Sequence, residues 1–145
     1  MKTEHQYLKP LNIEMNGIVD SRSFKDKKDS RSNEWKAQRK KYGFDERETW
    51  DLDFTMSCWI YEHLKMFKDV NPIAVEKEKF LVPILQDNLT EKMEERNLEE
   101  VLDIVCEGLE DYILASDQIF RSNIVLAKAE NAYKVLAIVF PALWW

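Results

Sequence analysis

The stretch YGFDERETWDLDFTMSCWIYEHLKMF, Tyr42 to Phe67, decides the fold because it carries the strongest helical pattern in the chain. From Trp50 onward, apolar residues cover well over half of the circumference of a helix with 3.6 residues per turn. They are Trp50, Leu52, Phe54, Met56, Trp59, Ile60, Leu64 and Phe67. A helix that is apolar on most sides is expected at the centre of a bundle. We therefore predict a core helix that begins near Trp50 and ends near Asp69.

The carboxylates at the beginning of this stretch are typical of a helix N-terminus. Asp45 with Glu48 three residues later has the spacing of a capping box, and Thr49 is a competing N-cap. Asp51 falls in the first turn, where the helix dipole favours a negative charge.

Asp53 is not explained by this chemistry, because it lies beside two large apolar neighbours inside the predicted helix. Arg47 is the nearest cation in sequence that could pair with it. Arg47, Asp51 and Asp53 are therefore candidate binding residues.

The rest of the chain predicts further helices and few turns. The chain has three Gly and four Pro in 145 residues, which are too few for the many tight turns of a β protein. We expect an all-α, compact bundle of four to five helices over residues 34–145, after a flexible N-terminal segment, 1–33. A first flanking helix is expected at Glu34–Tyr42, with Ser32 or Asn33 as N-cap and Gly43 as stop. Further helices are expected at Val82–Arg96, from Asn97 to about Ala115, and from Ser116 or Asp117 until Pro141 breaks the last one.

The cysteines and the hydropathy predict a soluble, cytoplasmic protein. Cys58 and Cys106 lie inside apolar helical patterns, no secretory signal precedes them, and both are expected to be reduced and buried. The longest uncharged runs are shorter than the roughly 18–20 apolar residues of a membrane span, so no membrane partner is expected.

Charge is unevenly distributed. Residues 22–41 carry nine Lys or Arg and three Asp or Glu, whereas residues 42–145 carry ten and twenty-one, a net charge of −11. The folded body should repel phosphate backbones, which argues against nucleic acid as its partner. The basic segment could contact RNA or DNA, but a solvated, flexible arm is the preferred interpretation.

Catalytic and metal-binding motifs are sparse. The chain has no Glu-x-x-His, no Cys-x-x-Cys, no P-loop and no Gly-x-Ser-x-Gly, so we predict no cofactor, no metal site and no catalytic residue. The alternative is a magnesium-dependent all-α nucleotide pyrophosphohydrolase, whose four-carboxylate pattern Glu91, Glu94, Glu100 and Asp103 match in residue type. Only one turn separates the two pairs, which is too little for two facing helices.

The C-terminus ends in Trp144 and Trp145 after the helix-breaking Pro141. The rings could fold back to seal the bundle. The functional alternative to this favoured interpretation is an aromatic anchor for a partner, since Trp is enriched in interface hot spots. We include both as candidate binding residues.

Three segments carry a resemblance. The opening Gly43-Phe44-Asp45-Glu46-Arg47-Glu48-Thr49-Trp50-Asp51-Leu52-Asp53 and the ending Pro141-Ala142-Leu143-Trp144-Trp145, together with the Gly108-Leu109-Glu110-Asp111 step, resemble a group of small acidic proteins of tailed bacteriophages and prophages. The likeness covers about half of the chain and excludes its first forty residues. It implies a setting, the cytoplasm of a bacterial host cell, and carries no reaction or binding residue with it.

These observations favour a non-catalytic phage or prophage accessory protein. We expect it to bind a host or phage protein through an acidic, aromatic-containing surface, with inhibition of a host defence protein as one form of that activity. Acidity of this degree also serves solubility, and the sequence leaves a homo-oligomer open.

Overall fold

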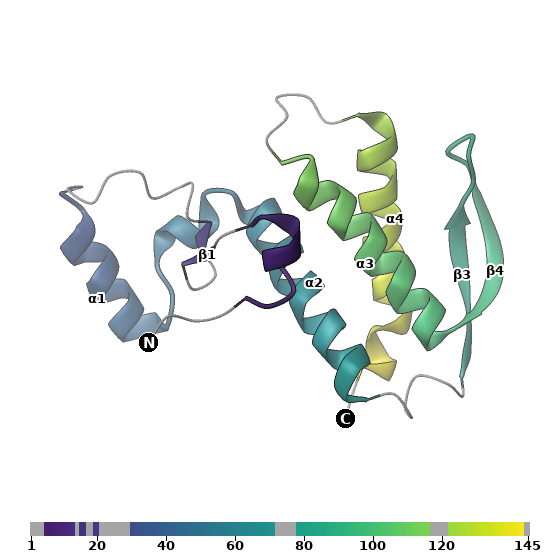
Figure 1. Ribbon diagram of the computed structural model, residues 1–145, viewed down its shortest axis with the longest axis horizontal. Coiled ribbons are helices and arrows are strands. Elements are labelled where there is room, and N and C mark those ends of the chain that lie inside the picture. Colours follow the sequence, from purple (N-terminus) through teal and green to yellow (C-terminus); the bar gives the residue numbers. More distant parts are fainter. Residues whose placement is uncertain are drawn as a thin grey trace. The chain divides into compact units, whose positions relative to one another are not determined.

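The computed structural model describes residues 5–13, 15–16, 19–20, 30–71, 78–116 and 122–143 (Figure 1). The chain divides into two units, Met1–Trp59 and Ile60–Trp145. The boundary falls inside the longest helix, α2, Leu52–Val70. The described residues are mostly helical, as the sequence predicted, but they also include strands.

The first unit contains short elements before α2. A 3-10 helix, η1, spans Lys9–Leu11, and strands β1, Met15–Asn16, and β2, Val19–Asp20, pair antiparallel. Helix α1, Ser32–Tyr42, ends at Gly43, whose φ of 85° is the left-handed stop that the sequence predicted. A second 3-10 helix, η3, Glu46–Thr49, then leads into α2. The predicted flexibility of segment 1–33 stays a prediction, and residues 21–29 lie outside the described residues.

Helix α1 begins earlier than expected. Its N-cap is Arg31, which makes no side-chain capping hydrogen bond, and Ser32 is already helical. The predicted cap at Ser32 or Asn33 is therefore wrong. Trp35 is the buried residue of this helix, at 6% exposure.

The second unit is built from the second half of α2, a β-hairpin and two long helices. Strands β3, Lys79–Leu85, and β4, Glu91–Asn97, pair antiparallel, and α3, Leu98–Leu114, follows directly. Helix α4, Asn123–Val139, packs along α3 and ends in the 3-10 helix η4, Phe140–Ala142 (Figure 1). The centre of this core is fully buried and consists of Val82, Val101, Leu102, Val105, Leu109, Ile113, Ala132, Val135 and Val139.

The contact between α3 and α4 depends on Gly108. A Cβ at this position would lie 2.7 Å from the backbone oxygen of Lys128 and 3.0 Å from the Cβ of Ala132. Glycine therefore allows the two helix backbones to approach closely. At the other side of α3, the Tyr61 hydroxyl donates to Glu110 over 3.0 Å, and Lys68 pairs with Asp103. These bonds hold the second half of α2 to α3.

The predicted helix Val82–Arg96 is wrong, because this segment forms the hairpin. The register pairs Val82 with Glu94 and Pro83 with Met93. The turn is closed by the Gln86 N–H, which donates to the Thr90 oxygen over 2.8 Å, and Leu89 adopts φ 64°. Hairpin loops of this length usually have Gly at the left-handed position. Because Leu89 occupies it here, the sequence gives no signal for the turn. The expected all-α fold is therefore only partly correct, because the described residues form four α-helices and two antiparallel strand pairs, β1–β2 and β3–β4.

The predicted ends of α3 are confirmed, whereas the predicted start of α4 is wrong. Asn97 caps α3, with its Oδ1 accepting from the Glu100 N–H at 2.9 Å, and Ala115 follows its last residue, both as predicted. The predicted start of the last helix at Ser116 or Asp117 is wrong. Ser122 caps α4 and accepts from the Val125 N–H over 3.2 Å.

Candidate functional site

The acidic start of α2 forms a buried ionic network in the first unit. Asp45 is 1% exposed and caps η3, accepting from the Arg47 N–H at 3.0 Å. The Arg47 guanidinium also binds Asp45, with Nε at 2.8 Å from Oδ1 and Nη2 at 2.6 Å from Oδ2. Arg39 adds Nε at 2.7 Å from the same carboxylate and Nη2 at 3.0 Å from Glu48. Asp45 is an N-cap as predicted, but of η3. The predicted capping box with Glu48 is wrong, because the Asp45 side chain accepts from the Arg47 N–H and the Glu48 carboxylate pairs with Arg39.

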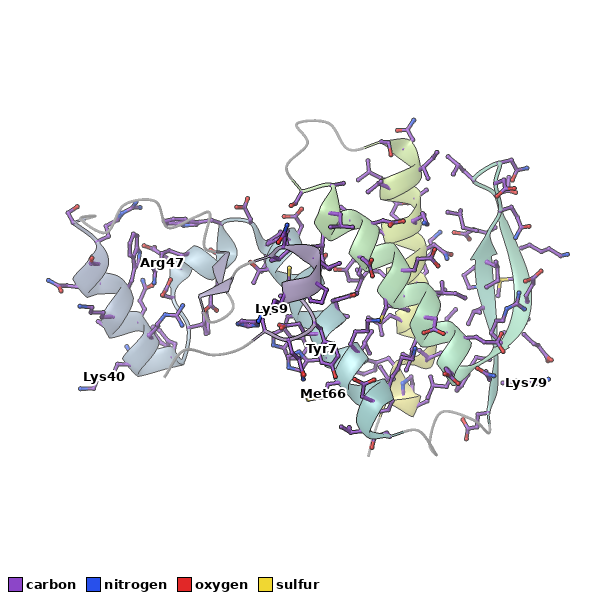
Figure 2. The ribbon with its side chains drawn as sticks, in the orientation of Figure 1. Tyr7, Lys9, Lys40, Arg47, Met66 and Lys79 are labelled. Carbon is purple, nitrogen blue, oxygen red and sulfur yellow. The ribbon has the colours of Figure 1, made fainter. Side chains whose placement is uncertain are left out.

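Arg47 has a structural position in this network. Figure 2 shows it in the segment that joins α1 to α2, where it is 8% exposed. Its guanidinium carbon lies 4.3 Å from the centre of the Trp35 ring. A bidentate ion pair stacked on an aromatic face is a geometry that guanidinium groups favour. Arg47 therefore forms its ion pair with Asp45, whereas the sequence suggested Asp53.

The two buried carboxyls of the network have opposite pKa shifts. Burial alone would raise the pKa of Asp45, but the hydrogen bonds from Arg47 and the positive charge of Arg39 outweigh it, so this pKa is lowered. At Glu48 burial outweighs the attraction of Arg39, and the neighbouring negative charge of Asp45 acts in the same direction, so the pKa of Glu48 is raised. The network is satisfied by its own members and holds η3 against α1.

Two tryptophans border the network. The Trp35 Nε1 donates to Glu46 over 2.7 Å, and the Trp35 and Trp50 rings meet edge to face, with centroids 5.7 Å apart. Arg31 lies over both rings, at 5.1 Å and 5.3 Å from their centres. Trp50 nevertheless remains 44% exposed, so it belongs to the surface as well as to this cluster.

Helix α2 exposes an apolar stripe at its beginning. Leu52, Met56 and Trp59 are 48%, 45% and 47% exposed, whereas Phe54 and Cys58 are 2% and 1% exposed. At about 100° per residue, the first three side chains share one narrow face, and the buried pair lies on the opposite side. The sequence predicted a central helix that is apolar on most sides, but these three side chains are exposed at its beginning. We call Leu52, Met56 and Trp59 the α2 stripe.

Asp51 and Asp53 flank the α2 stripe. Both are exposed, and each lies about 100° around the helix from Leu52, on opposite sides of it. The backbone oxygen of Asp51 accepts from the Thr55 N–H at 2.9 Å, and the backbone oxygen of Asp53 accepts from the Ser57 hydroxyl at 2.7 Å. Asp53 lies in the first turn of α2, where the helix dipole favours its charge, whereas Asp51, which was predicted there, precedes the first residue of the helix.

The other predicted binding residues, Trp144 and Trp145, lie outside the described residues. Leu143, half-buried, is the last position that the structure describes, so the aromatic terminus stays a prediction.

The four carboxylates of the hydrolase alternative are divided between β4 and α3, and each has a basic partner. Glu91 pairs with Lys134, Glu94 and Glu100 with Arg96, and Asp103 with Lys68. In the part of the chain that the structure describes, no three His, Cys, Asp or Glu side chains are grouped as metal ligands. The Glu-x-x-Glu of the sequence lies on a strand, whereas that enzyme class needs it on a helix.

Comparison with known proteins adds no family. No protein-family model, curated protein or solved structure matches the chain. Among the described helices, none is both long and apolar enough to cross a membrane.

Proposed function

We propose that the chain is a non-catalytic accessory protein of a bacteriophage or prophage that binds a host protein through the α2 stripe and the carboxylates beside it. The observation that carries this proposal is the exposure of Leu52, Met56 and Trp59, each close to one half, on a single face of a helix. The outward face of an amphipathic helix is normally polar.

An exposed row of this kind is a common mode of partner recognition. Helices bind protein grooves with large apolar side chains at positions i, i+4 and i+7, the spacing of Leu52, Met56 and Trp59. Trp is also among the residues most enriched in binding hot spots. Covering the exposed half of Trp59 would remove on the order of 100 Å² from water, worth about 2–3 kcal/mol at ~25 cal/mol per Å².

The charges beside the stripe indicate the chemistry of the partner. Asp51 and Asp53 place a carboxylate on each side of Leu52, and residues 42–145 as a whole carry a net charge of −11. The complementary surface is an apolar groove with Lys or Arg side chains along its rim. Such complementarity mainly speeds encounter and selects the partner, while the apolar contacts hold the complex together.

The resemblance to proteins of tailed bacteriophages and prophages supports a bacterial cytoplasm as the setting. A protein made during infection acts on the host's enzymes, among which defence and nucleic-acid enzymes present basic surfaces. Inhibition of one of these is the form of the activity to test first.

The test begins with a photo-crosslinking amino acid at Met56, introduced into the protein expressed in bacterial cells. The same amino acid at Phe140, which is 71% exposed on η4, is the matched control. A partner crosslinked from Met56 and not from Phe140 is then purified and its affinity measured. We expect Trp59→Ala to weaken binding at least tenfold, as hot-spot residues do, and Phe140→Ala to leave it unchanged.

Two further measurements distinguish the parts of the proposal. The Asp51→Asn, Asp53→Asn double variant should slow association and reduce its dependence on salt, with a smaller effect on dissociation. Trp59→Ala should remain folded, because half of its ring is already exposed. Failure to crosslink any saturable partner from Met56, or an affinity that Trp59→Ala leaves unchanged, would refute the proposal.

A further inference from the structure

The second unit contains a cavity that the proposed function does not use. It has a volume of about 430 Å³, within the range of roughly 300–1,000 Å³ of small-molecule sites. Its walls come from the hairpin turn, from α3 and from α4, and isoleucines from all three line it: Ile84, Ile104 and Ile124. The rest of the lining is mixed, with apolar Leu85 and Leu89 beside the polar side chains Gln86, Asp87, Glu107, Lys128 and Asn131.

One polar side chain of the cavity lining has an unmet hydrogen-bonding need. Asn131, on α4, is 4% exposed, and its Oδ1 has no hydrogen-bond partner in the part of the chain that the structure describes. A buried polar atom without a hydrogen-bond partner destabilises a fold by about 1–3 kcal/mol, so the Asn131 oxygen calls for an explanation. The oxygen and nitrogen of a carboxamide exchange places by rotation about one bond, so Asn131 can offer either to a bound molecule.

The charges at the cavity disfavour an anion. Lys128 lines it, but its Nζ pairs with Asp111 and lies 3.9 Å from Glu107. The hydrogen bond to Asp111 raises the pKa of Lys128, so the ammonium stays charged and committed to that carboxylate. Asp87 and Glu107 also line the cavity and leave its surroundings negative on balance.

We propose that this cavity binds a small, uncharged, mostly apolar molecule with an amide-like polar edge. The isoleucines would cover its apolar body. The Asn131 carboxamide would receive its edge, since a neighbouring donor and acceptor on the ligand match those of an asparagine side chain. The polar edge gives orientation and the apolar walls give most of the affinity, the usual division in small-molecule sites.

The experiment uses fluorine NMR on the full-length chain with three probes of similar size. These are para-fluorobenzamide, which is uncharged and carries an amide; fluorobenzene, which lacks the polar edge; and para-fluorobenzoate, which is an anion. For probes this small the expected Kd is on the order of 1 mM. We expect para-fluorobenzamide to bind more tightly than fluorobenzene, and para-fluorobenzoate to bind least.

Two variants locate the binding. Asn131→Leu keeps the branched shape with a larger side chain and removes the amide, so it should weaken para-fluorobenzamide about three- to tenfold and leave fluorobenzene bound equally or more tightly. Ile124→Trp, at a position 58% exposed, should narrow the cavity and weaken both probes. Asn33→Leu, an exposed residue of α1, is the control and should change neither.

Three results would overturn the proposal. The first is an absence of saturable binding by either neutral probe while Asn131→Leu raises the melting temperature, which would identify Asn131 as a hydrated structural residue. The second is para-fluorobenzamide binding that Asn131→Leu leaves unchanged. The third is para-fluorobenzoate binding as tightly as the amide, which would contradict the charge selectivity.

Discussion

Neutralising the two buried carboxylates that share Arg39 should have very different effects on stability. Asp45 receives three hydrogen bonds from Arg47 and an ion pair from Arg39 at 2.7 Å. Glu48 receives one bond, from Arg39 at 3.0 Å. Asp45→Asn and Glu48→Gln are therefore a matched pair of isosteric substitutions within one network.

The structure sets the expected magnitudes. Removing one partner of a buried ion pair costs about 3–5 kcal/mol, because the other charge remains buried. Asp45→Asn keeps one oxygen for the Arg47 N–H, so we expect a loss near the lower value, about 3 kcal/mol. Glu48→Gln should change stability by less than about 1 kcal/mol, because burial already disfavours the Glu48 charge and the amide oxygen can still accept from Arg39.

The pH dependence has a definite sign for each group. The folded pKa of Asp45 lies below its ordinary value of 3.8, so its contribution is complete above pH 3.8 and is lost as the pH falls through the folded pKa. The folded pKa of Glu48 lies above 4.5, so ionisation of Glu48 lowers stability as the pH rises from 4.5 through the folded pKa. The deficit of Asp45→Asn should therefore shrink in acid, whereas Glu48→Gln should gain relative to the parent above pH 4.5.

Urea titrations of the full-length chain, followed by far-UV circular dichroism, measure these differences. The Asp45→Asn, Arg47→Met double variant is the control, because it removes both charges and should recover part of the loss. An Asp45→Asn cost below about 1 kcal/mol, or one smaller than that of Glu48→Gln, would refute the assignment of Asp45 as the centre of the network.

Three other predictions test the second unit. Gly108→Ala should lower the free energy of unfolding by about 1–2 kcal/mol in a denaturant titration. The clash of a Cβ placed 2.7 Å from the Lys128 oxygen outweighs the gain of about 1 kcal/mol in helix propensity. A stabilised variant would contradict the close contact between α3 and α4. Ser122→Ala should cost about 1 kcal/mol through loss of the α4 cap, and an unchanged denaturation midpoint would place the helix start elsewhere. Burial raises the pKa of Cys106 to about 11. In a Cys58→Ser background, the reaction of Cys106 with Ellman's reagent should therefore be slow at pH 8 in the folded protein and rapid in urea. A fast reaction of the folded protein would show that the thiol is exposed.

Three of the predicted helix caps are correct because capping depends on neighbours within a few residues, although the predicted N-caps of α1 and α4 are wrong. Asn97 before Glu100, Gly43 after Tyr42 and Asp45 before η3 all have the roles that their types predict. The hairpin could not be predicted in the same way. Its loop has Leu89 at the left-handed position, and the apolar residues of β3 also fit a helix face when the pairing partner is unknown.

The candidate sites could not be predicted from the sequence for a related reason. Periodicity identifies apolar positions on a helix but does not show which of these side chains pack against another part of the protein. Helix α2 has apolar side chains on most of its circumference, so nothing in the sequence separates Phe54, 2% exposed, from Trp59, 47% exposed. Arg47 pairs with Asp45 rather than with a residue on the helix, because the 3-10 turn brings positions two apart together. The sequence does not distinguish Asn131 from the exposed polar residues of α4, because its burial depends on neighbours from other elements. Both proposed sites therefore contain residues whose type contradicts their surroundings, apolar side chains in water and an asparagine whose buried oxygen has no hydrogen-bond partner in the described residues. Such conflicts between local pattern and tertiary position are the places where a fold departs from what stability alone requires.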